Sequence, residues 1–293
     1  MEAKGLCDRW SFQNHRLFQG GIGCISSQII CTLNTIIKNK KDAIAALIPA
    51  RYGSTRFPGK ALVDIKGKPM IQWVYERTRC STLIDRVIVA TDDERILHAV
   101  KSFGGEAVMT SSHHVTGTDR IAEVAESLDC GIVVNVQGDE PLIQAAMIDE
   151  AIAPLANDSS IPMGTLCRKI EKREEAFDPN VVKVVFDTNN FALYFSRAPI
   201  PWDRDSWAGK GSWKEFPLAG PLYKHIGIYV YRREFLLNYS RMPQTALEAV
   251  EKLEQLRALE HGFRIKTVVT EHESFGVDIP DDLGKILTRM EES

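Results

Sequence analysis

The sequence lacks the cysteine and histidine spacings of a zinc or redox protein. Its six cysteines, at positions 7, 24, 31, 80, 130 and 167, form no C-x-x-C pair, and no histidines complete a zinc-type spacing. A structural zinc site and a disulfide framework are therefore not expected. Free thiols are typical of a reducing compartment, so we expect a cytoplasmic protein.

The sequence also lacks an excess of positive charge. It contains 36 Lys and Arg against 39 Asp and Glu, which gives a formal net charge of −3. Proteins that bind nucleic acids or anionic membranes usually carry a large basic excess. We therefore expect no nucleic-acid partner, although a local basic pocket for a small polyanion is compatible with this charge.

No apolar run near the start of the chain is pure enough to span a membrane. The most apolar stretch there, residues 17–37, contains Ser26, Gln28 and Asn34, so no stable membrane anchor is expected. Residues 1–41 are basic and poor in acids. We interpret them as an amino-terminal extension that is disordered or reflects a mis-called start, and an organelle-type leader is the alternative.

From residue 42 onward, short apolar runs alternate with amphipathic segments. The runs that predict buried strands are 43–48, 86–90, 107–109 and 132–136, and the segments that predict helices begin at residues 69, 94 and 119. Strands that alternate with helices of about ten residues predict an α/β fold, with a mostly parallel central sheet flanked by helices.

The second half of the chain predicts an inserted α+β subregion. Its predicted strands are 181–187, 192–195, 226–231 and 265–270. Residues 199–221 are rich in Pro, Gly and Trp and predict a long irregular connection. A helix is predicted over 247–260, with Val250, Leu253, Leu256 and Leu259 as its apolar stripe and with Glu248 and Glu251 facing water. No linker interrupts residues 42–293, so we interpret them as one domain.

A basic loop follows the first predicted strand. Arg51, Arg56 and Lys60 lie in a segment with two Gly and two Pro, at the carboxyl end of a buried strand, where open α/β sheets bind ligands. Backbone N–H groups and cations in such a loop suit a triphosphate. The loop is not a Walker A motif, because its glycine spacing differs and Ala61 follows the lysine. A solvated turn is the alternative.

Two aspartates are candidate metal ligands. Asp139 and Asp278 each follow a β-type run within a glycine-containing turn. Mg²⁺ is usually bound by one or two carboxylates, with water and substrate phosphates completing the shell. Aspartate also favours turns for purely structural reasons, and the sequence alone does not show whether the two residues meet.

Several segments together resemble the CMP-Kdo synthetases, the 3-deoxy-manno-octulosonate (Kdo) cytidylyltransferase family. The segments are LIPARYGSTRFPGK (47–60), GKPM (67–70), HVTGTDR (114–120), NVQGDEP (135–141), YFSRAPIPWDR (194–204), HIGIY (225–229), LEQLR (253–257) and GVDIP (276–280). They cover nearly all of residues 42–290 in one order, and residues 1–41 have no counterpart in the usual bacterial pattern.

This resemblance implies a nucleotide-diphospho-sugar transferase-like fold and a homodimer. It also implies transfer of CMP from CTP to the anomeric hydroxyl of Kdo, which activates the sugar for lipopolysaccharide or plant-type Kdo polysaccharide synthesis. Residues 190–235 are expected to contribute to the sugar pocket and to a dimer interface.

The resemblance also implies roles for individual residues. CTP binding is implied for Arg51, Ser54, Arg56, Lys60, Thr118 and Arg120. Kdo binding is implied for Gln137, Arg197, His225, Tyr229, Glu254 and Gln255. Asp139 and Asp278 are the implied ligands of one or two Mg²⁺ ions, and Arg51, Lys60 and Asp139 are the implied catalytic residues.

Three other functions are open alternatives. A cytidylyltransferase for a sialic acid shares the opening PARYGS, but usually continues differently from TRFPGK. A sugar-1-phosphate nucleotidyltransferase usually has a more glycine-rich opening. A non-catalytic nucleotide-binding protein on the same fold is the third, because fold alone does not determine function.

Overall fold

The computed structural model describes residues 43–53, 57–209, 211–218 and 220–292, and the structural statements below concern these residues. The predicted extension 1–41 and the loop residues Ser54 and Arg56 lie outside them. In the described part of the chain, no helix is both long enough and apolar enough to cross a membrane.

The sheet is built around β1 (Ile44–Ala50), which lies between two parallel neighbours, β4 (Arg86–Thr91) and β6 (Ile132–Asn135). Its side chains alternate between two faces, and both faces are buried. Ile44, Ala46 and Ile48 belong to one apolar cluster, and Ala45 and Leu47 belong to the other. A strand covered on both faces explains why this run is apolar at nearly every position.

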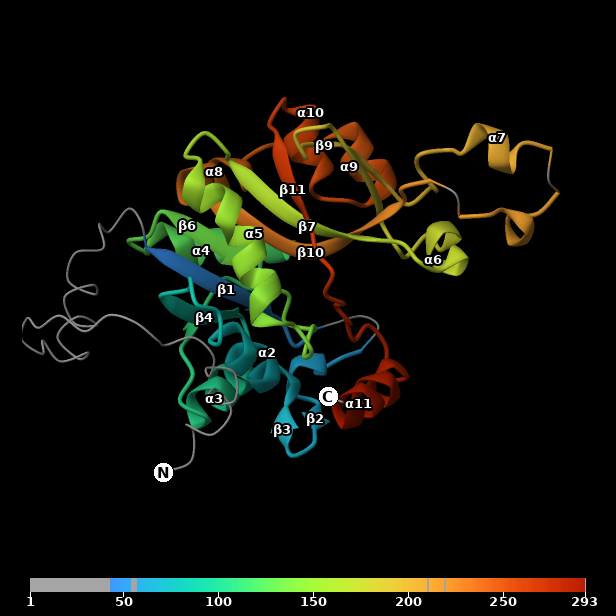
Figure 1. Cartoon of the computed structure of the whole chain (residues 1–293). Coiled ribbons are helices and arrows are strands. Elements are labelled where there is room, and N and C mark those ends of the chain that lie inside the picture. Colours follow the sequence, from blue (N-terminus) through green and yellow to red (C-terminus); the bar gives the residue numbers. More distant parts are fainter. Residues whose placement is uncertain (1–42, 54–56, 210, 219, 293) are drawn as a thin grey trace, which may run out of the picture. The chain divides into compact units, whose positions relative to one another are not determined.

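The sheet continues on both sides of this centre, in the order β11-β7-β10-β6-β1-β4-β5, and β8 and β9 extend it from β10 (Figure 1). The other strands are β2 (Asp64–Ile65), β3 (Lys68–Pro69), β5 (Ala107–Met109), β7 (Met163–Lys169), β8 (Lys183–Phe186), β9 (Ala192–Ser196), β10 (Tyr223–Arg232) and β11 (Ile265–Val269). β5 and β11 pair in parallel with β4 and β7, whereas β10 runs antiparallel to β6 and β7.

Helices cover both faces of the sheet. The helices are α2 (Met70–Thr78), α3 (Glu94–Ser102), α4 (Gly117–Glu126), α5 (Ala145–Asn157), α6 (Arg173–Phe177), α7 (Arg204–Trp207), α8 (Arg233–Tyr239), α9 (Ala246–Glu251), α10 (Leu256–Glu260) and α11 (Asp282–Glu292), with 3₁₀ turns η2 (Lys60–Leu62) and η3 (Trp213–Glu215). α2, α3 and α5 contribute to one apolar cluster, and α4, α8 and α10 to the other. The predicted α/β class, a mostly parallel central sheet flanked by helices, is confirmed.

The single helix predicted over residues 247–260 is wrong. The chain forms α9 and α10, separated at Lys252, whose φ of 53° lies in the left-handed region. Val250, assigned to the apolar stripe, is 81% exposed. The break changes the helical phase, so the residues after it face the core in a register that a continuous helix does not provide.

The prediction that Glu248 and Glu251 face water is also wrong. Glu248 is 4% exposed, and Arg257 donates two hydrogen bonds to its carboxylate, at 2.6 and 2.9 Å. Glu251 accepts hydrogen bonds from the Ser196 hydroxyl at 2.6 Å and from the Arg197 backbone N–H at 3.0 Å. Both carboxylates therefore connect α9 to its surroundings.

In the described residues of the predicted irregular connection 199–221, the regular elements are α7 and η3. Around it, Phe177, Trp207 and Phe216 form a small apolar cluster separate from the two main ones, and the Trp207 and Phe216 rings stack at 5.5 Å. Figure 1 shows this segment as an arm that extends away from the sheet. β7, α5 and α11 were not predicted from the sequence.

Candidate active site

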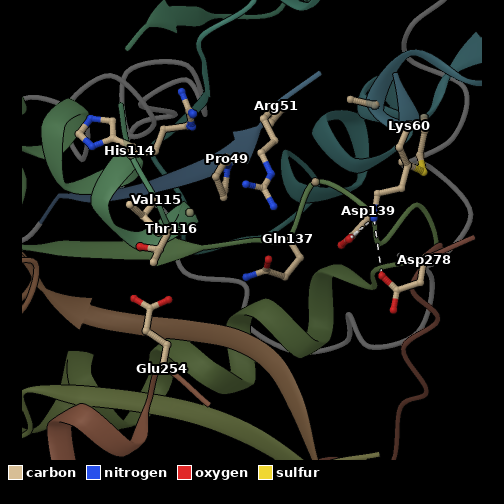
Figure 2. A pocket seen from close by; sticks show the side chains of 16 residues that line it. Pro49, Arg51, Lys60, His114, Val115, Thr116, Gln137, Asp139, Glu254 and Asp278 are labelled. Atoms are coloured by element: carbon tan, nitrogen blue, oxygen red, sulfur yellow. Dashed lines mark hydrogen bonds and ion pairs between the residues drawn. The ribbon is translucent and has the colours of Figure 1, made fainter. Parts of the chain in front are cut away.

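A cavity of about 390 Å³ lies where the carboxyl ends of β1 and β6 meet the start of α4. This is the edge at which open α/β sheets bind ligands. Its wall comes from segments far apart in the sequence: Pro49–Arg51, Lys60, Ala61, Met70, His114–Gly117, Arg120, Gln137–Asp139, Glu254 and Asp278 (Figure 2).

Asp139 and Asp278 meet at this cavity, although they are far apart in the sequence. The Lys60 ammonium joins them, with Nζ 2.6 Å from Asp139 Oδ2 and 3.8 Å from Asp278 Oδ1. The Val277 N–H donates to the Asp139 carbonyl at 2.9 Å, which holds the two segments together. Two neighbouring carboxylates form a donor set that Mg²⁺ accepts when substrate phosphates complete its shell. The described residues contain no cluster of three or more protein ligands.

Gly138 allows the Asp139 turn to pack directly against the end of β1. A Cβ atom at this position would lie 2.8 Å from the Pro49 carbonyl oxygen, closer than real contacts allow. The backbone approach continues the pairing of β6 with β1, because Val136 N–H donates to the Leu47 carbonyl at 3.1 Å. The turn residues Gln137 and Asp139 are thereby placed on the cavity wall.

The base of the basic loop that follows β1 is closed by a backbone contact. The Gly59 N–H donates to the Tyr52 carbonyl at 2.9 Å, and the Arg95 guanidinium lies 3.3 Å from the centre of the Tyr52 ring. Gly59 has a φ of 73°, which favours glycine. Arg51 and Lys60 line the cavity from the two ends of this loop, whereas the predicted Ser54 and Arg56 lie outside the described residues.

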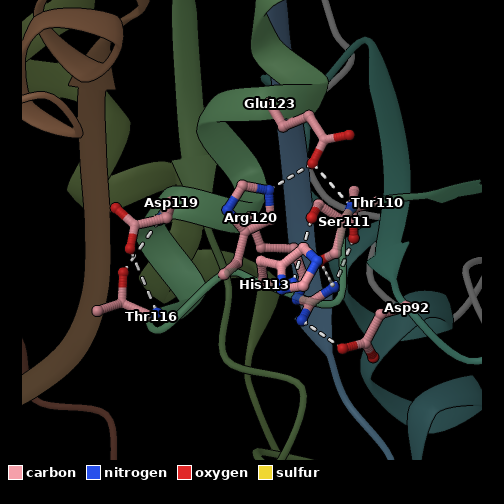
Figure 3. A network of polar contacts seen from close by, with 9 residues as sticks. Asp92, Thr110, Ser111, His113, Thr116, Asp119, Arg120 and Glu123 are labelled. Carbon is pink, nitrogen blue, oxygen red and sulfur yellow. Dashed lines mark hydrogen bonds and ion pairs between the residues drawn. The ribbon is translucent and has the colours of Figure 1, made fainter.

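Arg120, predicted to bind CTP, borders the cavity but is bonded to its own chain. It is 3% exposed, and its guanidinium donates to Asp92 Oδ2 at 2.8 Å, to the Thr110 hydroxyl and to the Ser111 carbonyl at 3.4 Å (Figure 3). These contacts attach the start of α4 to the strands beside it. The structure therefore places Arg120 where it supports the cavity wall.

Thr118, the other predicted CTP residue on α4, is 4% exposed and is not among the lining residues. Its hydroxyl, close to the Glu254 carboxylate, acts to lower the pKa of Glu254. α4 begins with a capping box between Thr116 and Asp119, which fixes this first turn.

His114 lines the cavity but was given no role from the sequence. Its Nε2 hydrogen-bonds to Glu123. Glu123 also accepts from the Ser111 N–H at 2.9 Å (Figure 3). The segment 114–120 was part of the resemblance, so the signal for this residue was present. It was missed because no property of a lone histidine distinguishes a pocket residue from a loop residue.

Gln137 and Glu254 line the cavity, and their predicted contact with Kdo stays a prediction. In the view of Figure 2, Glu254 lies apart from the Lys60, Asp139 and Asp278 group, with Gln137 between them. The Gln137 amide donates to the Gly227 carbonyl at 3.2 Å, which ties the turn to β10.

The other residues predicted for Kdo do not line the cavity. His225 Nε2 lies 2.9 Å from the Thr165 hydroxyl, and burial lowers the pKa of His225 to about 3, so its ring is neutral. The His225 and Tyr229 rings pack at 5.3 Å, and burial, with the Glu254 charge, raises the pKa of Tyr229. Gln255 is 3% exposed, and its buried Nε2 has no hydrogen-bond partner among the described residues.

Arg197 is likewise not a lining residue. Its guanidinium donates to the Glu251 carbonyl at 2.7 Å and to the Pro179 carbonyl at 2.9 Å. The structure thus places Arg197 beside the chain that leads from α9 to Glu254. Its predicted contact with a sugar carboxylate stays a prediction.

One carboxylate oxygen of Glu254 lacks a hydrogen-bond partner among the described residues. Its Oε1 is buried and has no partner in the described part of the chain. Burial raises the pKa of Glu254 to about 7, although the Thr118 hydrogen bond and the Arg257 charge lower it in part. An unpaired buried acceptor facing a cavity is typical of a group that receives a hydrogen bond from a ligand.

We expect Glu254→Gln to stabilise the protein at alkaline pH. The folded-state pKa of Glu254, about 7, exceeds its ordinary value of 4.5, so ionisation destabilises the folded state. This cost is absent below about pH 4.5, grows up to about pH 7 and is complete above it. Thermal unfolding should show the variant and the parent alike near pH 4.5, and the variant more stable at pH 8 by about 1–3 kcal/mol. Glu271→Gln, at an exposed site, is the control, and equal shifts at both pH values would contradict the assignment.

The cytidylyltransferase family model matches residues 45–267. The chain belongs to the cytidylyltransferase family. Among curated members, the 3-deoxy-manno-octulosonate cytidylyltransferase of Geobacter sulfurreducens is 59% identical over 249 residues, which cover 84% of this chain and 99% of the relative. The enzyme of the same name from Geotalea uraniireducens is 60% identical over 252 residues, which cover 85% and 99%.

Solved structures of cytidylyltransferases are also similar to this chain. A CMP:2-keto-3-deoxy-manno-octonic acid synthetase complexed with CTP is 43% identical, with a TM-score of 0.79 over 85% of this chain and 99% of that one. A cytidylyltransferase from Leptospira borgpetersenii, 17% identical with a TM-score of 0.57 over 85% and 87%, shares the fold alone.

Proposed function

We propose that this enzyme transfers CMP from CTP to the anomeric hydroxyl of Kdo, giving CMP-Kdo and pyrophosphate. The observation that carries the proposal is the Asp139–Lys60–Asp278 group at the edge of a cavity that also holds Arg51 and Glu254. The names of the relatives at 59–60% identity and the CTP complex of the 43% identical structure support it.

In the proposed reaction, the sugar hydroxyl oxygen attacks the α-phosphorus of CTP. The bond from the α-phosphorus to the bridging oxygen breaks, pyrophosphate leaves with the electron pair, and the hydroxyl proton passes to solvent. Arg51 and Lys60 offset the charge that grows on the leaving pyrophosphate. Asp139 and Asp278 would hold one or two Mg²⁺ ions, which supply charge neutralisation at the phosphates and a lowered hydroxyl pKa.

On the sugar side, the chain supplies hydrogen-bonding groups around a hydroxyl-rich substrate. Gln137 offers an amide at the centre of the cavity wall, and Glu254 offers its unpaired Oε1. His225 and Tyr229 of β10, whose rings pack at 5.3 Å, are polar but uncharged, because burial keeps both in their neutral forms at pH 7.

We expect Arg197→Ala to raise the Michaelis constant for Kdo by about tenfold or more, because the segment that leads to Glu254 loses charged hydrogen bonds. CTP binding should be spared, because Arg51 and Lys60 line the cavity and Arg197 does not. Calorimetry with CTP alone and steady-state titration of Kdo measure the two effects. Arg79→Ala, at an exposed position after α2, is the control. Lost CTP affinity with an unchanged Kdo response would contradict the assignment of Arg197 to the sugar side.

A pyrophosphate-release assay tests the function and its alternatives. With CTP and Mg²⁺, we expect turnover with Kdo that exceeds turnover with N-acetylneuraminate or a hexose-1-phosphate. A preference for N-acetylneuraminate would identify a sialic acid cytidylyltransferase. Nucleotide binding without turnover on any of the three would identify a non-catalytic protein on the same fold.

We also propose that residues 42–293 act as one catalytic domain in the cytoplasm and that the enzyme is a homodimer. Leu193, Trp202 and Val250, in or near the region 190–235, are 63%, 56% and 81% exposed, and exposed apolar side chains favour a protein interface. Light scattering should give twice the chain mass of 32.9 kDa, and a monomer at micromolar concentration would contradict the dimer.

A further inference from the structure

Asp278 lies in residues 271–281, the segment that connects β11 to α11. We call this segment the C-terminal strap. This segment has no regular helix or strand along its length. Such a segment has no backbone ladder to hold it, so side-chain and single backbone contacts must determine where Asp278 lies.

We propose that Ser274 and Glu140 are positioning residues for the metal carboxylates. The Ser274 hydroxyl donates to Glu140 Oε2 at 2.5 Å across 134 positions in the sequence. Glu140 directly follows Asp139, so this bond connects the strap to the turn that carries the first carboxylate. The inference rests on the proposed function, in which Asp139 and Asp278 act together on a divalent cation.

A second contact beside this bond shows that the strap and the turn are joined at two points. The Val277 N–H donates to the Asp139 carbonyl at 2.9 Å, three residues after Ser274. Two bonds to consecutive turn residues limit sliding and rotation of the strap, whereas one bond allows the strap to pivot. Asp278, the next residue, is thereby directed toward Lys60 and Asp139.

The Ser274–Glu140 hydrogen bond is not needed for packing of the strap alone. Glu140 is only 9% exposed, and burying a carboxylate costs free energy that an apolar side chain of similar size avoids. Ser274 provides the hydrogen bond that offsets part of this cost. Packing of the strap is already supplied by fully buried Val277, in a cluster with Met70 and Ile286.

The residues on either side of Ser274 have their own contacts. Glu273 forms an ion pair with Arg168 of β7, and the Arg289 guanidinium lies 3.4 Å from the centre of the Phe275 ring. Loss of the Ser274 bond should therefore leave the strap attached to the protein and alter the direction of Asp278. We therefore expect a folded enzyme that needs a higher Mg²⁺ concentration for turnover.

The test compares Ser274→Ala with Ser274→Thr, which keeps the hydroxyl. We expect Ser274→Ala to raise the Mg²⁺ concentration for half-maximal turnover by about 10-fold, within the 10–100-fold range typical of residues that orient metal ligands. Its turnover at saturating Mg²⁺ and its melting temperature should stay close to those of the parent. Ser274→Thr should restore the Mg²⁺ response, and Thr288→Ala, which removes a local α11 hydrogen bond, should leave it unchanged.

Hydrogen exchange supplies a readout that needs neither CTP nor Kdo. In the parent, Mg²⁺ should slow the exchange of strap amides, and Ser274→Ala should need more Mg²⁺ for the same slowing. An unchanged Mg²⁺ response in both measurements would overturn the inference, as would an equal change in Thr288→Ala. If the parent releases no pyrophosphate from CTP and Kdo, the proposed function fails, while the exchange experiment still tests the strap.

Discussion

Asp139→Asn and Asp278→Asn should each lower turnover by at least ~10²-fold while the protein stays folded. A neutral amide is a poorer ligand for Mg²⁺ than a carboxylate, and electrostatic groups aimed at a reacting phosphate typically contribute 10²–10³-fold to rate. Both side chains are partly exposed, at 32% and 58%, so the exchange of one oxygen for an amide group should not disturb the core.

The measurement is steady-state pyrophosphate release at saturating Mg²⁺, with circular dichroism to confirm folding. Asp281→Asn, at an exposed position on the same strap, is the matched control and should keep normal turnover. Near-normal activity of either variant would remove that aspartate from the metal site.

Lys60→Met should lower turnover by about 10²–10³-fold and should strengthen the binding of Mg²⁺ in the absence of CTP. Turnover falls because the ammonium no longer offsets charge on the leaving pyrophosphate. Mg²⁺ binding strengthens because, in the parent protein, Lys60 neutralises the two carboxylates that would bind the cation. Its Nζ lies 2.6 Å from Asp139 Oδ2 and 3.8 Å from Asp278 Oδ1. A Met side chain fills similar space without competing charge.

Calorimetry with Mg²⁺ alone and pyrophosphate release with both substrates measure the two effects. Lys101→Met, at an exposed position in the last turn of α3, is the control for loss of one positive charge. Weaker Mg²⁺ binding by Lys60→Met would contradict competition for the carboxylates, and unchanged turnover would remove Lys60 from the phosphate site.

The first half of the fold could be predicted from the sequence, because its strands are buried on both faces. The apolar runs 43–48, 86–90 and 132–136 were predicted as strands, and they correspond to β1, β4 and β6. The amphipathic pattern of α3 and the Gly104 after it also predicted the helix correctly. In such segments the local pattern and the tertiary environment require the same structure.

In the second half, the predicted strands 181–187, 192–195, 226–231 and 265–270 correspond to β8, β9, β10 and β11. The elements that were missed or wrong there depend on distant partners. β7 pairs with β10 and β11, which lie about 60 and 100 residues later, and its MGTLCRK sequence has no strong periodic pattern. The break at Lys252 depends on the contacts of Glu248 with Arg257 and of Glu251 with Ser196, which the apolar pattern of residues 247–260 does not contain.

By itself, the sequence determined the α/β class of this protein, the basic loop after β1 and the identity of the residues in the family motifs. These depend on residue type and short spacing, which can be read along the chain. The tertiary structure alone decided that Asp139 and Asp278 share Lys60, that Arg120 and Arg197 are bonded to their own chain, and that Glu254 has an unpaired oxygen at the cavity. The reason is that each of these features depends on distances between segments remote in sequence, and those distances are set by how the sheet and its helices pack.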